Sequence, residues 1–115
     1  MLGSIYLARI YFTDLSDYKI RPVLVIKEFG EDCLCLQLTT QLQHNGVLLN
    51  QGDIDSGELK KESMVVVPKS CTLHNSILIK QIAVLTETKL EEIFQVFCEK
   101  LGCTRFLGLI GVGPR

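Results

Sequence analysis

Most of the chain alternates short apolar segments with polar turns, a pattern that predicts β-strands. Residues 4–11 are rich in β-branched and aromatic side chains, and residues 22–29 open with an apolar run that indicates burial on both faces of a sheet. Residues 33–39 alternate, with leucines on one face and cysteine, glutamine and threonine on the other. The tight turn at residues 30–32 predicts that the second and third segments form a hairpin.

The second half continues with strands and ends in a helix. Residues 41–57 are polar apart from a short strand at 47–49, and residues 57–61 predict one helical turn. Strands are expected at 63–68, which Pro68 ends unless it lies on a sheet edge, and at 77–85. A capping box at 88–91 predicts the start of a helix that Gly102 would end. Its apolar residues recur at helical spacing and should pack on the sheet: Leu90, Ile93, Phe94, Phe97 and Leu101.

These elements predict a mainly β fold with helices (α+β), in the form of a small antiparallel barrel with a C-terminal helix. The barrel domain is expected to span residues 1–102. Residues 103–115, which contain three glycines, form a tail to which we assign no role.

Composition and charge indicate where in the cell this domain works and how it can bind nucleic acid. The chain is 47% hydrophobic and 22% charged, with no apolar run near the ~20 residues of a membrane span and no leader sequence, so we expect the cytoplasm. A net charge of −1 argues against broad electrostatic binding of nucleic acid. A local basic groove is still possible from the seven cations Arg9, Lys19, Arg21, Lys60, Lys61, Lys69 and Lys80.

The five cysteines include no C-x-x-C pair, and neither histidine completes a metal-ligand set. We expect reduced and mostly buried thiols, with no metal site. Motifs for a nucleotide or another cofactor are also missing from the sequence, so no cofactor is predicted.

A polar loop at residues 13–19 leads into Arg21 and Pro22. Proline fits the first position of a strand and biases the residue before it toward extended backbone. The buried strand that follows therefore holds Arg21 at the lip of a loop, where a side chain serves a ligand rather than a core. The alternative is a surface arginine paired with Asp14 or Asp17.

Several segments at these spacings resemble the PemK/MazF family of toxin–antitoxin ribonucleases. They are Gly3, FTDLS at 12–16, K-x-RPVLVI at 19–26 and LTTQ at 38–41, with weaker similarity through 57–63 and the final helix. The resemblance implies an SH3-like barrel that forms a homodimer. It also implies a single-stranded RNA substrate and a cognate antitoxin whose C-terminal segment covers the Arg21 site.

One well-placed cation, several hydroxyls and the backbone amides suit cleavage of RNA, because RNA carries its own nucleophile in the 2′-OH. An enzyme need only orient that hydroxyl, stabilise charge on the phosphate and protonate the leaving 5′-oxygen, without a metal. The products would be a 2′,3′-cyclic phosphate and a 5′-OH. Arg21 suits charge stabilisation, because its pKa above ~12 makes it a poor proton donor.

The resemblance assigns catalysis to Arg21 and Thr39, with Thr40 as a rival one residue along. Further residues are candidates for lining the site or contacting RNA: Asp14, Ser16, Tyr18, Lys19, Thr40, Gln41, Lys60, Ser63 and Lys80. Some relatives carry an arginine and an aspartate in the strand at 64–68, which this chain lacks. The general acid and base therefore stay unassigned, and His44 and His74 match no family motif.

Two other interpretations remain open. One is a non-catalytic binding module on the same fold, like a related barrel toxin that grips DNA gyrase, and the other is an inactive family member. The joint presence of Arg21 and Thr39 favours the enzyme, whereas the low net charge leans mildly toward the binding module.

Overall fold

The computed structural model describes residues 2–11, 16–43 and 45–103. They form a seven-stranded sheet in the order β4-β6-β3-β2-β1-β7-β5, and every neighbouring pair is antiparallel. The strands are β1 (Ser4–Tyr11), β2 (Tyr18–Phe29), β3 (Asp32–Thr39), β4 (Gly46–Leu49), β5 (Ile54–Gly57), β6 (Ser63–His74) and β7 (Leu78–Leu85). Two short 3₁₀ turns, η1 (Gln51–Asp53) and η2 (Asn75–Ile77), and one helix, α1 (Glu87–Leu101), complete the described elements.

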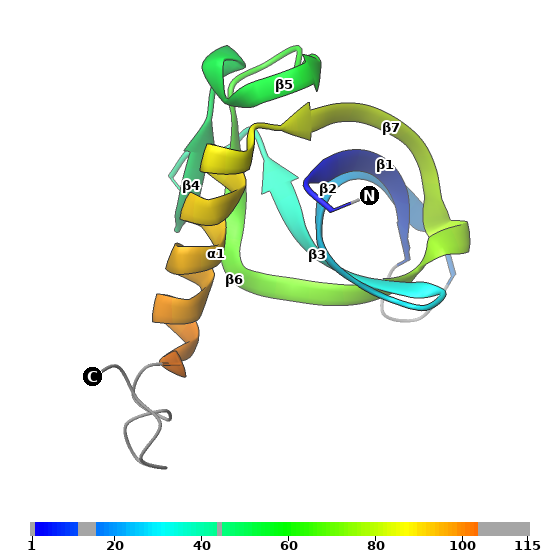
Figure 1. Ribbon diagram of the computed structural model, residues 1–115. Coiled ribbons are helices and arrows are strands. Elements are labelled where there is room, and N and C mark those ends of the chain that lie inside the picture. The colour runs from blue at the N-terminus through cyan, green and yellow to red at the C-terminus, as the bar shows by residue number, and fades with distance from the viewer. Residues whose placement is uncertain (1, 12–15, 44, 104–115) are drawn as a thin grey trace.

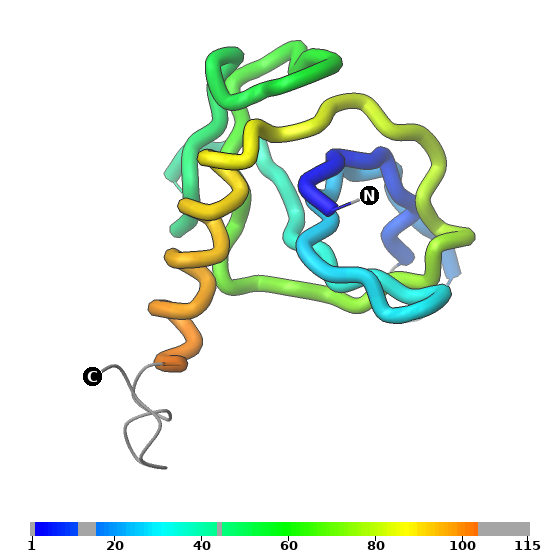
Figure 2. Tube along the Cα trace, in the orientation of Figure 1, coloured from blue at the N-terminus to red at the C-terminus, as the bar shows by residue number. Residues whose placement is uncertain are grey.

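The sheet curls into a barrel, with α1 outside it. Figure 1 shows β1, β2, β3, β6 and β7 around a ring, and α1 beside β4 and β6. The tube in Figure 2 follows the same closed path and places the helix on one flank only. The structure therefore confirms the predicted small antiparallel barrel with a C-terminal helix.

Alternation along the strands divides the core between the two faces of the sheet. Leu24 of β2 and Leu36 of β3 belong to one buried cluster, which also contains Ile93 of α1. Val23 and Cys35 belong to a second cluster on the opposite face. The predicted β2–β3 hairpin and the predicted burial of β2 on both faces are confirmed.

β6 is longer than predicted, because Pro68 does not end it. The register between β3 and β6 shifts, so that Leu36 pairs with Ser70 but Leu38 pairs with Val65. Pro68 falls inside this interruption, where its missing N–H costs no ladder hydrogen bond. The strand then continues to His74 and contributes to both hydrophobic clusters.

Two predicted helical features were wrong in position. The turn expected at 57–61 is absent from the described structure there, and a 3₁₀ turn forms earlier, at Gln51–Asp53, where Asn50 caps it. Helix α1 begins at Glu87 because Thr86, rather than Thr88, accepts a hydrogen bond from the Lys89 N–H at 3.2 Å. Gly102 ends the helix with a φ of +73°, as predicted.

Candidate active site

A cavity of about 520 Å³ opens where β3 ends. Three strands and the segment after β3 supply its walls: Arg21 and Pro22 of β2, Gln37, Leu38 and Thr39 of β3, Thr40 and Gln41 directly after β3, and Ser63, Val66 and Lys69 of β6. Its described lining contains two cations and no carboxylate. The cavity is therefore suited to an anion.

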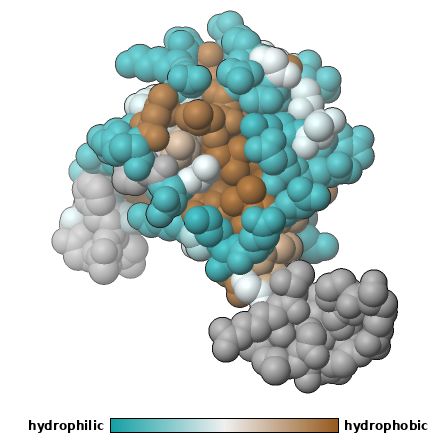
Figure 3. All heavy atoms as spheres, turned by 90° about the vertical axis from the view of Figure 1, so that its left-hand side faces the viewer, coloured by the Kyte–Doolittle hydropathy of each residue, from teal (hydrophilic) through white to brown (hydrophobic). Residues whose placement is uncertain are grey.

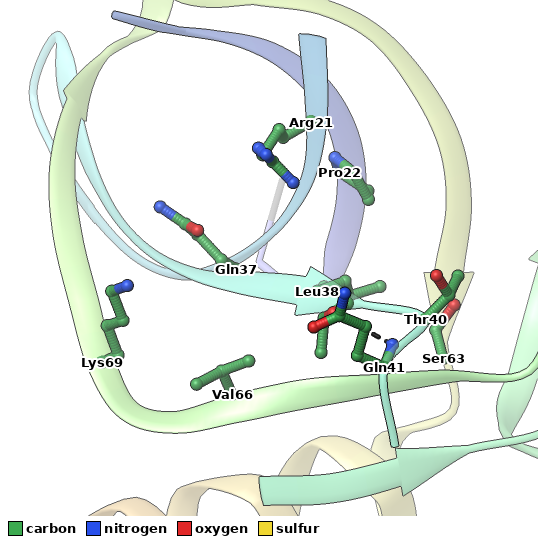
Figure 4. A pocket seen from close by; sticks show the side chains of 10 residues that line it. Arg21, Pro22, Gln37, Leu38, Thr40, Gln41, Ser63, Val66 and Lys69 are labelled. Carbon is green, nitrogen blue, oxygen red and sulfur yellow. Dashed lines mark hydrogen bonds between the residues drawn. The ribbon is translucent and has the colours of Figure 1, made fainter. Parts of the chain in front are cut away.

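Arg21 is held in place by the strand that follows it. Val23 is fully buried and pairs with Gln37 of β3. Arg21 precedes Val23 by two residues, so alternation directs its side chain to the same face as Gln37. In Figure 4 the side chains of Arg21 from β2, Gln37 from β3 and Lys69 from β6 lie around the same open space.

The guanidinium of Arg21 is exposed, and none of the ion pairs found among the described residues involves it. The alternative pairing with Asp17 is not among these ion pairs, and Asp17 Oδ1 instead accepts a hydrogen bond from the Tyr18 N–H at 2.8 Å. Asp14, the other alternative partner, lies outside the described residues. A planar fork of donors in a cavity with no acid in its described lining is a good receptor for two phosphate oxygens.

Thr39 presents a hydroxyl at the end of β3. Its Oγ1 accepts a hydrogen bond from the Gln41 N–H at 3.1 Å, which fixes the oxygen and leaves the hydroxyl hydrogen able to donate. Thr39 is half-buried, whereas Thr40 is exposed and also lines the cavity. Both threonines are thus brought to the site, and the geometry favours Thr39 as the more rigidly placed donor.

Ser63 lines the cavity, but its hydroxyl is already engaged. It is 6% exposed, and its Oγ donates to the Lys61 carbonyl at 3.1 Å. This bond fixes the chain where it enters β6. Figure 4 shows Ser63 and Thr40 together on the side of the cavity away from Lys69.

Other predicted site residues lie elsewhere. Ser16, Tyr18 and Lys19 line neither this cavity nor the larger one beside it. The ring of Tyr18 instead packs against Tyr11, with ring centroids 5.5 Å apart. Lys80 lines the neighbouring cavity.

Of the seven cations that the sequence singled out, Arg21 and Lys69 line the first cavity, and Lys60, Lys61 and Lys80 line the neighbouring one. Arg9 donates to the Ser76 carbonyl at 3.0 Å. Gln37 has no predicted role, although alternation places it on the same face of β3 as Thr39.

His74 is not part of the described lining of this cavity. The Nδ1 atom of His74 lies 2.8 Å from the Ser76 hydroxyl, and its Nε2 lies 3.6 Å from the Glu31 carboxylate, at the far end of β6. His44 lies outside the described residues.

All five cysteines are free, as predicted, but their burial varies. Cys33 and Cys35 are buried with their sulfur atoms 3.5 Å apart, Cys71 and Cys103 are half-buried, and Cys98 is exposed. Burial, together with the hydrogen bond to Cys33, raises the pKa of the Cys35 thiol above its usual 9.0. The buried thiols therefore belong to the core.

Fold and site together define a class: a small antiparallel barrel whose cavity, where β3 ends, has two cations and no carboxylate in its described lining. Residues 2–101 match the family described as PemK-like, MazF-like toxins of type II toxin–antitoxin systems. The chain belongs to this family, which confirms the resemblance seen in the sequence.

Solved structures share the fold of this chain. The Mycobacterium tuberculosis toxin MazF-mt6 superposes with a TM-score of 0.68 at 18% identity, over 86% of this chain and 96% of that one. An endoribonuclease in complex with its cognate antitoxin, from a mycobacterial species, superposes with a TM-score of 0.64 at 20% identity, over 89% of this chain and 93% of that one. A comparison with curated protein sequences finds no match. Within the described part of the chain, no helix is long and apolar enough to cross a membrane.

Proposed function

We propose that this protein is a metal-independent endoribonuclease toxin that cleaves single-stranded RNA and is neutralised by a cognate antitoxin. The observation that carries the proposal is the cavity where Arg21, Lys69 and Thr39 surround space for a phosphate without any acidic neighbour in the described lining. Membership of the toxin family supports the same reading.

In the proposed reaction, the 2′-OH of the substrate attacks the adjacent phosphorus in line with the leaving 5′-oxygen. Negative charge grows on the non-bridging oxygens, where the Arg21 fork and the Thr39 hydroxyl donate hydrogen bonds. The P–O5′ bond breaks as the P–O2′ bond forms, water takes the 2′-OH proton, and water returns a proton to the 5′-oxygen, which gives a 2′,3′-cyclic phosphate and a 5′-OH. The described lining contains no histidine or carboxylate, so we assign Arg21 and Thr39 to positioning and charge stabilisation rather than to proton transfer.

The test uses a long single-stranded RNA in EDTA, with the wild type beside Arg21→Ala and Arg21→Lys. We expect wild-type cleavage to survive EDTA and to leave cyclic-phosphate and 5′-OH ends. Arg21→Ala should lower the rate about 100-fold or more, which corresponds to about 2.7 kcal/mol of transition-state stabilisation. Arg21→Lys keeps the charge but loses the planar fork, so we expect only partial recovery.

A folded wild type that cleaves none of several RNAs would refute the proposal. That outcome would indicate that the protein is a non-catalytic binding module. Equal activity in wild type and Arg21→Ala would show that the cleaving site lies elsewhere.

We also propose an antitoxin partner for this chain. One structural neighbour is itself in complex with its cognate antitoxin. The five lysines and arginines that line the two neighbouring cavities would attract an acidic segment, which would then exclude RNA. An acidic antitoxin peptide should stop cleavage, and excess RNA should relieve the inhibition.

Finally, we propose that the protein is a cytoplasmic homodimer. Figure 3 shows a continuous apolar band on the face that carries α1 and β4. Leu48 of β4 and Leu101 of α1 are 45% and 51% exposed, and β4 is an edge strand of the sheet. A second copy would cover this apolar surface and the unpaired edge.

A further inference from the structure

A second cavity, of about 580 Å³, adjoins the candidate active site. Its floor is a row across three neighbouring strands, because Leu7 of β1 pairs with Pro22 of β2 on one side and with Lys80 of β7 on the other. Leu59 and Ile82 add further apolar surface. Such a lining favours a flat, largely apolar ring over a hydrated ion.

The two cavities adjoin, because Pro22, Thr40 and Ser63 line both of them. A strand of RNA with one phosphate beside Arg21 would therefore place a neighbouring nucleotide over the Leu7 floor. Lys60, Lys61 and Lys80, which also line the second cavity, would meet its phosphates.

Glu58 is the only carboxylate in the described lining of the second cavity. Its backbone N–H donates to the Ile82 carbonyl at 3.3 Å, which ties this segment to β7. The preceding residue, Gly57, has a φ of +76°, and a side chain there would collide with the Ile82 carbonyl. Glycine thus permits the close approach that sets Glu58 at the cavity wall.

The rest of the described lining is apolar, basic or, at Thr40, Ser63 and Gln81, polar and neutral. The carboxylate makes a specific demand on its ligand. It accepts hydrogen bonds only, and it is best satisfied by two adjacent donors. Among the RNA bases, guanine alone offers adjacent N1–H and N2–H₂ donors on its Watson–Crick edge. The uracil edge has a single N–H between two carbonyl oxygens, which would repel the carboxylate.

We propose that this second cavity binds the nucleobase next to the cleaved bond and that Glu58 selects guanine there. The inference rests on the proposed ribonuclease function, since it takes RNA as the ligand of the adjoining cavity. Glu58 would be a specificity residue, and the lysines around it would hold the backbone without reading sequence.

The test measures binding rather than cleavage, with short oligouridines that carry one variable base. Their 2′-fluoro groups replace the nucleophilic hydroxyl, so the ligand stays intact. Wild type should bind the guanine-containing oligonucleotide about ten-fold or more tightly than the all-uridine one, in line with the usual discrimination by a bidentate contact. Glu58→Gln should bring the two affinities to within about two-fold of each other, since the amide can pair with either edge.

A matched control separates base reading from charge. Glu62→Gln removes the same negative charge from a residue that lines a third, smaller cavity and not the second. It should raise the affinity for all oligonucleotides alike and leave the guanine preference intact.

A wild type without base preference would overturn the inference, as would a preference that survives in Glu58→Gln. The inference would also be overturned if Glu58→Gln changed the binding of an acidic antitoxin peptide but not the binding of the oligonucleotides. The cavity would then be assigned to the protein partner. A wild type that prefers guanine but cleaves no RNA would support this inference while refuting the catalytic proposal.

Discussion

Replacing Thr39 with valine tests the placement of the catalytic hydroxyl, because valine keeps the β-branched shape and removes only the oxygen. The hydroxyl of Thr39 contributes little to the stability of the fold. The Oγ1 of Thr39 accepts one hydrogen bond, from the Gln41 N–H at 3.1 Å, and Gln41 is exposed, so water can replace the acceptor. We expect the free energy of unfolding to fall by about 0.5–1.5 kcal/mol.

The expected loss of activity is much larger. Removing one preorganised donor to a developing oxyanion typically costs about 100- to 1,000-fold in rate, or about 2.7–4 kcal/mol. Single-turnover cleavage of a saturating RNA should therefore slow about 100-fold in Thr39→Val, while urea denaturation shows a protein that is still folded. Thr39→Ser restores the hydroxyl and should recover most of the rate.

Thr40→Val is the matched control, since Thr40 lines the same cavity but is exposed. We expect it to stay within about three-fold of wild type, well short of the effect of losing an oxyanion donor. A folded Thr39→Val with near wild-type activity would show that the Thr39 hydroxyl is not the catalytic donor. If Thr40→Val lost activity instead, the catalytic hydroxyl would be one residue further along.

Three further predictions concern the fold and the interface. Thr86→Ala should lower the free energy of unfolding by about 1 kcal/mol in urea, because Thr86 caps α1, and an unchanged value would indicate that the helix starts elsewhere. The free energy of unfolding should decline above pH 9.0. The unfolded Cys35 thiol ionises there, whereas burial keeps the folded thiol protonated. The stabilisation is therefore full below pH 9.0 and is lost as pH rises. Urea denaturation under reducing conditions should give a shallower alkaline slope in Cys35→Ala than in wild type, and identical slopes would contradict this cause. Leu48→Lys should convert the proposed dimer to a monomer in light-scattering measurements, whereas Ile79→Lys, at 47% exposure on β7, should not.

The lengths of the strands were predicted less well than their existence. Residues 18–21 are exposed and mostly polar, yet they extend β2 because Tyr11, Ile10 and Arg9 of β1 pair with three of them. In the same way, β6 runs past Pro68 because β3 lies beside its second half. Strands far along the chain pair with β2 and β6 and so set where these strands end. A local sequence pattern cannot predict such boundaries.

The candidate site was predicted only in part. Arg21, Thr39, Thr40 and Gln41 lie at strand ends next to polar segments, so a pattern of buried strand and adjoining loop locates them. Lys69 reaches the cavity only because β6 crosses beside β3, and that contact depends on the register shift between the two strands. Tyr18 and Lys19, although close to Arg21 in sequence, line neither of the two neighbouring cavities.

Patterns along the chain account for the features that depend on sequence neighbours. Alternation predicts which faces of β2 and β3 are buried, the turn at 30–32 predicts their hairpin, and Gly102 predicts the end of α1. Which side chains meet depends instead on the folded arrangement of the strands. Lys69 and Arg21 line one cavity, and Glu58 approaches Ile82 in the next, because curling of the sheet brings distant strands together. Local interactions choose the elements, whereas the burial of apolar faces against one another chooses their arrangement, and the site is a product of that arrangement.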